Sequence, residues 1–269
     1  MKKNNAIRSD MAIELVGGDT KISQTLQIKK SRVEIDDNLS KKIGRPKGSY
    51  ITLETSIVNS GRIDKYDSLS KEISIALKEI TKSKIKCVLV VGLGNPNLTA
   101  DALGKEVFSN LIITKHMDTE DRKKLGIKSA ICAICPNVSG ITGIESFDVI
   151  KGVVDRIKPD LVVAVDALAS ASVARLGAAF QLCSSGITPG SGVANHRVRL
   201  DYDSLGVAVV SLGVPLVVYA STIIFDAAGE EAIKDLPEEL SGLIVTPKTI
   251  DILVQDCAKV IASGINGAF

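Results

Sequence analysis

Residues 87–104, CVLVVGLGNPNLTADALG, constrain the fold more than any other stretch of the chain. The segment begins with a short apolar run, which a glycine-punctuated loop closes. Such a run is typical of a strand that is buried on both faces of a sheet. The loop after a strand of this kind lies at the edge where open α/β sheets bind ligands, so Asp101 is a candidate for chemistry. Asp is also a favoured helix cap, and this segment alone does not separate the two roles.

Predicted strands and helices alternate along most of the chain. The apolar patterns predict buried strands at 87–92, 130–134, 160–165 and 207–212, and helices at 67–84, 102–116, 146–157, 167–181 and 246–263. This alternation predicts an α/β fold with a doubly wound, mostly parallel sheet and flanking helices. We expect residues 1–269 to form a single domain.

The N-terminal part of the chain has a different pattern. Residues 10–60 are β-rich, and the stretches 27–35 and 50–57 predict a small antiparallel β element. A basic turn, KKIGRPKG, is predicted at 41–48 between these strands. A solvated loop is the simpler interpretation of that turn, and a nucleic-acid patch is the alternative.

Composition excludes several classes of function. Aromatic residues make up 3% of the chain and Trp is absent, which argues against base-stacking platforms. A net charge of +2 gives no support to direct nucleic-acid binding. We find no apolar run long enough to span a bilayer and no signal peptide, so we expect a cytoplasmic protein without a membrane partner.

The five cysteines are expected to be reduced thiols, since no export signal is found. Cys132 and Cys135 form one C-x-x-C, but a second pair and a nearby His are missing. Core packing at a strand end is therefore a better interpretation than a metal site. We expect neither a metal nor an organic cofactor.

A second carboxylate follows another buried strand, in the sequence DLVVAVDALAS. If the two strands are neighbours or flank the switch point of the sheet, Asp101 and Asp166 face one crevice. Two nearby carboxylates do not ionise together easily, so one of them holds a proton. One can then act as base on a water while the other donates to a carbonyl oxygen, which suits peptide-bond hydrolysis.

Other catalytic motifs are missing from the sequence. It contains no H-E-x-x-H, no G-x-S-x-G and no P-loop. His116 is expected at a helix end, where the dipole favours a cation. His196 lies in the loop expected to cover the crevice, and Ser191 between two glycines is interpreted as hinge or substrate-binding backbone.

Nine stretches, in order along the chain, resemble the germination protease of spore-forming bacteria. They are IRSDMAIE (7–14), KGSYITLE (47–54), VVGLGNPNLTADALG (90–104), NLIITKH (110–116), GITGIES (140–146), KPDLVVAVDALAS (158–170), SGITPGSGVANHR (185–197), LGVAVVSLGVP (205–215) and VTPKTID (245–251). The resemblance implies an aspartic-type endopeptidase that initiates degradation of small acid-soluble spore proteins during germination. It also implies that the catalytic pair is Asp101 and Asp166.

Further expectations come from the same resemblance. The family is made as a precursor that removes its own N-terminal segment, forms homotetramers and acts in the forespore or spore core. Its fold is similar to that of hydrogenase-maturing endopeptidases. In this chain residues 1–6 would be a short leader, with self-cleavage near Asn5 and Ala6. Three positions depart from the family pattern, namely His196 in place of a lysine, Tyr219 in place of an acid and Ala100 where proline is common.

The glycine loops supply the candidates for binding substrate or the oxyanion. They are Gly94, Asn95, Gly140 and Gly143, together with Ser191 and His196. Two alternatives stay open at this point. One is a metal-dependent maturation protease of the same fold, and the other is a non-catalytic relative that acts as a binding or regulatory protein.

Overall fold

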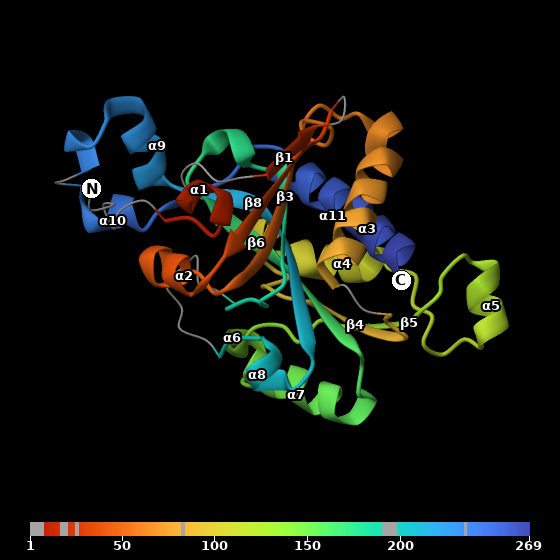
Figure 1. Ribbon diagram of the computed structural model, residues 1–269. Coiled ribbons are helices and arrows are strands. Elements are labelled where there is room, and N and C mark those ends of the chain that lie inside the picture. The colour runs from red at the N-terminus through yellow and green to blue at the C-terminus, as the bar shows by residue number, and fades with distance from the viewer. Residues whose placement is uncertain (1–7, 17–20, 25–26, 82–83, 190–197, 234–235) are drawn as a thin grey trace.

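The computed structural model describes residues 8–16, 21–24, 27–81, 84–189, 198–233 and 236–269. In this part of the chain a nine-stranded sheet has the order β1-β2-β3-β7-β8-β6-β4-β5, and β9 pairs with β8 (Figure 1). The strands are β1 (Lys21–Gln24), β2 (Lys29–Ile35), β3 (Gly48–Glu54), β4 (Cys87–Gly92), β5 (Ala130–Ile134), β6 (Leu161–Ser170), β7 (Ala179–Cys183), β8 (Ala208–Tyr219) and β9 (Ile244–Val245).

Helices connect and cover these strands. They are α1 (Ala12–Leu15), α2 (Asp37–Ile43), α3 (Tyr66–Thr81), α4 (Leu103–Asn110), α5 (Thr119–Lys124), α6 (Ser139–Thr142), α7 (Ser146–Ile157), α8 (Tyr202–Leu205), α9 (Ala220–Ala228), α10 (Glu238–Ser241) and α11 (Ile250–Ala268). Among the helices of the described residues, none combines the length and apolar character that a bilayer span needs.

Four adjacent strands, β8-β6-β4-β5, run parallel and confirm the predicted α/β class. From β4 the chain adds β5 on one side, and it then crosses to the other side of β4 to form β6. The direction of winding therefore reverses between β4 and β6, which makes their carboxyl ends the switch point of the sheet.

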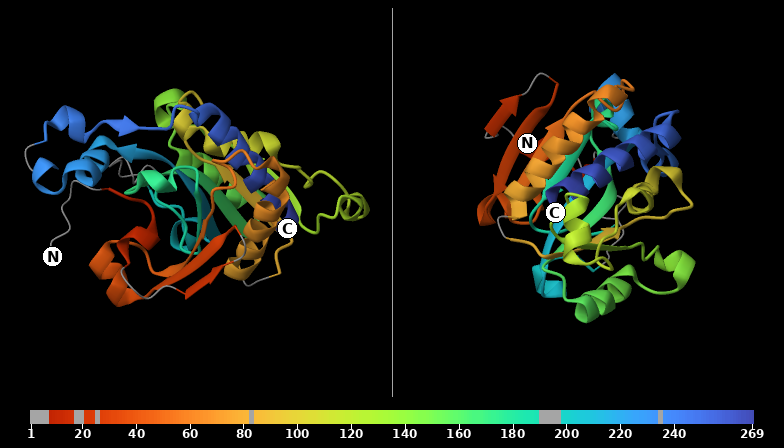
Figure 2. Two further views of the ribbon diagram at one scale, coloured as in Figure 1. Left: turned by 90° about the horizontal axis from the view of Figure 1, so that it is seen from above. Right: turned by 90° about the vertical axis from the view of Figure 1, so that its right-hand side faces the viewer.

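Helices cover both faces of the parallel strands. α3, α4 and α11 pack on one face, and α7 and α8 lie on the other (Figures 1 and 2). β4 shows why the strand sequence is apolar throughout. Val88 and Val90 belong to the first core cluster, while Leu89 and Val91 belong to the second. Because successive side chains of a strand point to opposite faces, a strand between two helical layers is apolar at every position.

The predicted antiparallel element is present and is joined to the main sheet. β1, β2, β3 and β7 pair antiparallel in succession, and β7 then pairs antiparallel with β8. The β-rich N-terminal region is thus an extension of the same sheet. It brings residues close to 50 next to residues close to 183, because Tyr50 pairs with Cys183.

The helix predicted at 167–181 is wrong. β6 continues to Ser170, a short 3-10 turn covers Val173–Arg175, and β7 follows at Ala179–Cys183. The alanines of this stretch favour a helix locally. Residues 167–170 instead pair with β8, across an irregularity between Leu168 and Ala169, so tertiary pairing overrides the local propensity.

Three smaller boundaries also differ from the prediction. α4 ends at Asn110, so His116 lies beyond it in an exposed turn. α11 begins at Ile250 rather than at 246. Part of the predicted basic turn belongs to α2, which starts at an Asp36 cap and stops at Gly44, where φ is +68°.

Candidate active site

A cavity of about 790 Å³ opens at the switch point, beside the end of β4 and the second half of β6. Asp101 and Asp166 both line this carboxyl-edge cavity. The sequence prediction that the two carboxylates share one crevice therefore agrees with their positions. Charged and amide side chains from distant parts of the chain line the same cavity, namely Asp10, Arg45, Gln181 and Arg199.

The loop after β4 folds back on itself to hold Asp101. Gly94 has a φ of +96°, and a Cβ there would lie 2.1 Å from the Asp101 main-chain oxygen and 2.9 Å from its Oδ1. The next residue, Asn95, donates its backbone N–H to Asp101 Oδ2 at 2.7 Å. Glycine is therefore required by both the backbone conformation and the space, and the loop fixes one carboxylate oxygen.

A second glycine contact sets where α4 begins. A Cβ on Gly92 would lie 2.3 Å from the Gly104 carbonyl oxygen, and a Cβ on Gly104 would lie 2.3 Å from the Leu93 oxygen. The first turn of α4 thus touches the end of β4 backbone to backbone. Asp101 lies in the segment that these contacts close, in the 3-10 turn Thr99–Asp101.

Asp166 lies within β6, opposite Gly213 of β8. On the other side of β6 lies β4, whose last residue, Gly92, pairs with Val165. Asp166 is therefore the first residue of β6 beyond the end of β4. Its residue exposure is 7%, and its Oδ1 accepts the N–H of Ala167 at 3.0 Å. Asp166 thus places a carboxylate at the cavity, although the residues before and after it in β6 are apolar.

Residues 9–14 are held along the wall of the cavity. Asp10 donates its N–H to the Ala169 oxygen at 2.8 Å, and its Oδ2 accepts the Ala169 N–H at 3.0 Å. Gln181 brackets the segment, since its Oε1 accepts the Ala12 N–H at 2.7 Å and its Nε2 donates to the Asp10 oxygen at 3.1 Å. Arg45 donates to the Ser9 oxygen and lies 3.3 Å from Asp10 Oδ1.

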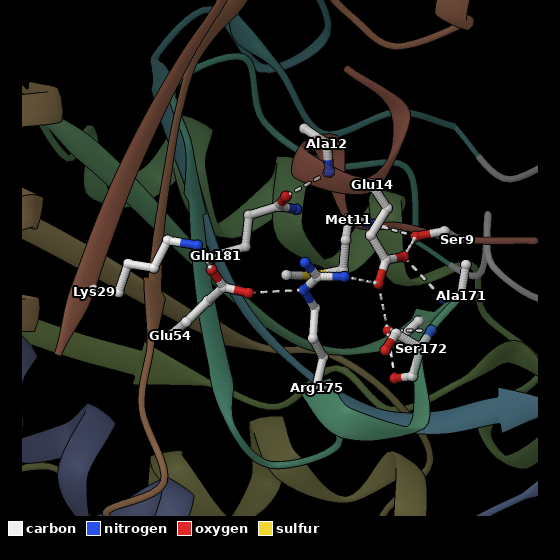
Figure 3. A network of polar contacts seen from close by, with 11 residues as sticks. Ser9, Met11, Ala12, Glu14, Lys29, Glu54, Ala171, Ser172, Arg175 and Gln181 are labelled. Atoms are coloured by element: carbon white, nitrogen blue, oxygen red, sulfur yellow. Dashed lines mark hydrogen bonds and ion pairs between the residues drawn. The ribbon is translucent and has the colours of Figure 1, made fainter. Parts of the chain in front are cut away.

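Figure 3 shows Arg175 between two acids that anchor this segment. Its Nη1 lies 2.9 Å from Glu14 Oε1, and its Nε lies 2.9 Å from Glu54 Oε1. The side chain of Glu14 is only 5% exposed. Glu14 also accepts hydrogen bonds from Ser170 Oγ at 2.7 Å and from the Ala171 N–H at 2.8 Å. The N-terminal segment is therefore locked to the end of β6, four positions past Asp166.

The remaining predicted site residues fall into two groups. Gly140 and Gly143 are exposed and are not among the residues that line the cavity, although Val138 is. The N–H of Gly143 already donates to the Ser139 oxygen at 2.8 Å. The other candidates lie outside the described residues, namely Asn5, Ala6, Ser191 and His196.

The thiols of the C-x-x-C have features of packed side chains. Cys132 Sγ lies 3.5 Å from the Val88 oxygen, and burial raises the pKa of both Cys132 and Cys135 to about 11. Within the described ranges no cluster of three or more His, Cys, Asp or Glu residues is arranged to hold a metal ion. A thiol that keeps its proton is a poor ligand and a poor nucleophile.

Two carboxylates that line one cavity at the switch point of an α/β sheet are suited to acid–base chemistry such as hydrolysis. A germination protease family profile matches residues 1–236 of the chain. The chain belongs to the germination protease family. It is accordingly a peptidase with a role in spore germination.

Curated relatives agree with this assignment. The germination protease of Caldanaerobacter subterraneus subsp. tengcongensis is 38% identical, over 97% of this chain and 93% of its own length. That of Clostridium acetobutylicum is 35% identical over 97% and 94%, and that of Priestia megaterium is 32% identical over 95% and 86%. Among solved structures, the [NiFe] hydrogenase maturation protease HycI from Thermococcus kodakarensis KOD1 covers 71% of this chain and 98% of its own, at 20% identity and a TM-score of 0.37. A likeness this weak carries no weight for function.

Proposed function

We propose that the protein is an aspartic-type endopeptidase that initiates the degradation of small acid-soluble spore proteins, with Asp101 and Asp166 as its catalytic pair. The observation that carries the proposal is that both side chains line one cavity at the switch point of the sheet. The family supplies the peptidase activity. Of the three acids that line the cavity in the described part of the chain, Asp101 follows β4 and Asp166 lies in the adjacent parallel strand β6, whereas Asp10 comes from the N-terminal segment.

In the proposed reaction one carboxylate takes a proton from a water, whose oxygen forms a bond to the scissile carbonyl carbon. The other carboxyl group, still protonated, donates a hydrogen bond to the carbonyl oxygen. The tetrahedral intermediate collapses when the carbon–nitrogen bond breaks and a proton passes to the amine. No other nucleophile is needed, because water forms the new bond itself.

Two features of the chain support this division of labour. Asp101 is fixed by the Asn95 N–H, so its carboxylate is oriented before substrate arrives. Asp166 is nearly buried, and burial disfavours two negative charges in one cavity, so the pair is suited to sharing a proton. The backbone N–H group of Gly94, which lines the cavity, is the candidate for steadying the oxyanion.

The test uses Asp101→Asn and Asp166→Asn, each assayed on a purified small acid-soluble spore protein. Each variant should lose cleavage by at least about 10²-fold while keeping the wild-type circular dichroism spectrum. Asp148→Asn is the matched control, since Asp148 is an exposed acid of α7 that does not line the cavity. Near wild-type cleavage by either cavity variant would remove that residue from the proposal.

We also propose that the N-terminal leader regulates the enzyme, on the basis of the resemblance to the germination protease family. If the leader keeps the enzyme inactive, a chain that begins at Ala6 should cleave faster than the full chain, and equal rates would contradict that regulation. Self-cleavage near Asn5 and Ala6, assembly into a tetramer and action in the spore core stay predictions.

A further inference from the structure

The last part of β6 has an edge that β4 does not cover. β4 pairs with β6 only as far as Gly92, which lies opposite Val165, and the chain then turns into the loop that holds Asp101. At this turn the Leu93 N–H donates to the Val165 oxygen at 2.8 Å. β6 itself continues to Ser170, so its last residues extend beyond the end of β4, beside the catalytic cavity.

The backbone of β6 shows which of these residues face the uncovered edge. In a strand the N–H and C=O of one residue point to the same edge, and those of the next residue point to the opposite edge. Val165 bonds toward β4, while Ala169 exchanges bonds with Asp10, whose N–H donates to the Ala169 oxygen and whose Oδ2 accepts the Ala169 N–H. The extra residue of the irregularity, Leu216, belongs to β8, so β6 keeps its alternation here. Ala167, midway between Val165 and Ala169, therefore faces the same edge as they do.

Ala167 leaves a gap of one residue in this row of hydrogen bonds. It lines the catalytic cavity and is partly exposed. Its N–H donates to Asp166 Oδ1 at 3.0 Å. Within the part of the chain that the structure describes, no group donates a hydrogen bond to its carbonyl oxygen. The strand thus presents a main-chain acceptor next to Asp166, and such an acceptor is suited to the N–H of another chain.

The N-terminal segment shows that this edge accepts an added length of chain. Asp10 occupies the position next to the gap through a main-chain hydrogen bond to Ala169, as a strand does when it is added to a sheet. The gap lies at a cavity of about 790 Å³, which is large enough for a few residues of an extended peptide. An extended main chain that passes Asp166 therefore suits both the gap and the cavity.

We propose that the substrate binds in extended form along this edge of β6 and donates a backbone N–H, close to the scissile bond, to the Ala167 oxygen. This inference rests on the proposed function, since it names the group that holds the peptide beside Asp166. The contact joins main chain to main chain, so it positions a peptide of any sequence, and the side chains of the cavity wall select among sequences. A bond held in this way reacts faster because its orientation is fixed before the reaction.

The first test follows binding by nuclear magnetic resonance of the isotopically labelled full chain. The ligand is a spore-protein peptide in which a methylene group replaces the scissile carbonyl, so it binds without being cleaved. A chain that begins at Ala6 is titrated in parallel, because of the proposed leader. The carbonyl carbon resonance of Ala167 should shift downfield on binding, as a new hydrogen bond requires. The matched control is the carbonyl of Ala133 in the edge strand β5, which does not line the cavity and should not shift.

The second test measures kcat/KM on peptides that each carry one N-methyl group, at successive amides flanking the scissile bond. One methylated amide should lower kcat/KM at least about ten-fold and should also remove the Ala167 shift, because the donor is lost. An ester at the same position removes the N–H without the added methyl group and should lower kcat/KM as well. The amides of the two adjacent residues point away from β6, so methylation there should cost much less.

Three outcomes would overturn the proposal. They are a bound peptide that leaves the Ala167 resonance unmoved, absence of binding by both chains, and equal tolerance of methylation at every amide. Failure of the catalytic assignment gives a different result. Cleavage that persists in Asp101→Asn or Asp166→Asn would remove that residue from the pair, whereas the shift at Ala167 and the effect of methylation would remain.

Discussion

Gly94 and Asp101 are in direct contact across a closed loop, and a Cβ on Gly94 would lie 2.1 Å from the main-chain oxygen of Asp101. The contact explains why the stretch after β4 contains a glycine at this position and an acid seven residues later. The loop returns to its own start, where the Asn95 N–H holds Asp101 Oδ2 at 2.7 Å. The position of one proposed catalytic carboxylate thus depends on the absence of a side chain at Gly94.

Gly94→Ala should reduce cleavage by about 10- to 100-fold, because the added methyl group displaces the Asp101 backbone. Gly126→Ala is the matched control. Gly126 has a similar positive φ of +74°, but nothing lies within 4 Å of a Cβ there. Both variants place an alanine at a positive φ, which costs roughly 1–2 kcal/mol, so the steric contact is the main difference between them. Equal rates for the two variants, measured with folded protein, would contradict the role given to this loop.

Glu14→Gln should lower the free energy of unfolding by about 3 kcal/mol, since it leaves Arg175 without one partner in a largely buried network. Urea unfolding followed by circular dichroism measures the change. For comparison, Asp37→Asn breaks an ion pair with Lys47 in which the Asp37 and Lys47 side chains are 75% and 64% exposed, and it should leave the free energy of unfolding nearly unchanged. Similar losses in the two variants would show that residues 9–14 are not locked to β6.

Ionised Glu54 contributes to the free energy of unfolding, and this contribution depends on pH. Burial acts to raise the pKa of Glu54, but the hydrogen bonds and charges of Arg175 and Lys29 outweigh it and lower the pKa below 4.5. Because the folded-state pKa is lowered, the stabilisation is present above about pH 4.5 and is lost as the pH falls through the folded-state value.

Glu54→Gln should therefore flatten the acid side of the stability curve. The wild type should be the more stable protein near pH 7, and the difference should shrink as the pH falls below about 4.5. Urea unfolding at a series of pH values measures both curves, with Asp148→Asn as a control for the loss of one negative charge. A difference that is constant across this range would contradict the direction of the shift.

Activity should be unchanged in excess chelator. The proposed reaction uses only carboxyl groups and water, so EDTA or 1,10-phenanthroline should leave the rate of cleavage within experimental error of the untreated rate. A loss of activity that zinc or nickel restores would instead favour the metal-dependent alternative. The comparison is made on the same enzyme preparation, with an equal concentration of a non-chelating isomer as the control.

Local patterns predicted the parallel half of the fold well. The limits of β4 and β5 agree with the apolar runs at 87–92 and 130–134, because these strands are buried on both faces and end at turn signals. Prediction was wrong at 167–181, where the sequence favours a helix but β6 continues along β8. Pairing with a strand some fifty residues away leaves no signal in the local pattern.

The candidate site, too, was predicted only where the local sequence carries a signal. Asp101 and Asp166 were predicted because each follows a buried strand. Asp10, Arg45 and Gln181 were missed, although they line the same cavity. The contact between Gln181 and Asp10 joins residues 171 positions apart, so it arises from the sheet extension and not from any motif. The sequence indicates which strand ends present acids, and the fold determines which distant side chains join them.

The most direct test of the account compares the two single variants, Asp101→Asn and Asp166→Asn, with the double variant, by kcat/KM on one purified spore protein. Residues that act as one unit are not additive, because losing either member already removes the shared proton. The account predicts that each single variant loses at least about 10²-fold and that the double variant loses little more. Near wild-type activity in either single variant, or a loss in the double variant equal to the product of the two single losses, would contradict a catalytic pair.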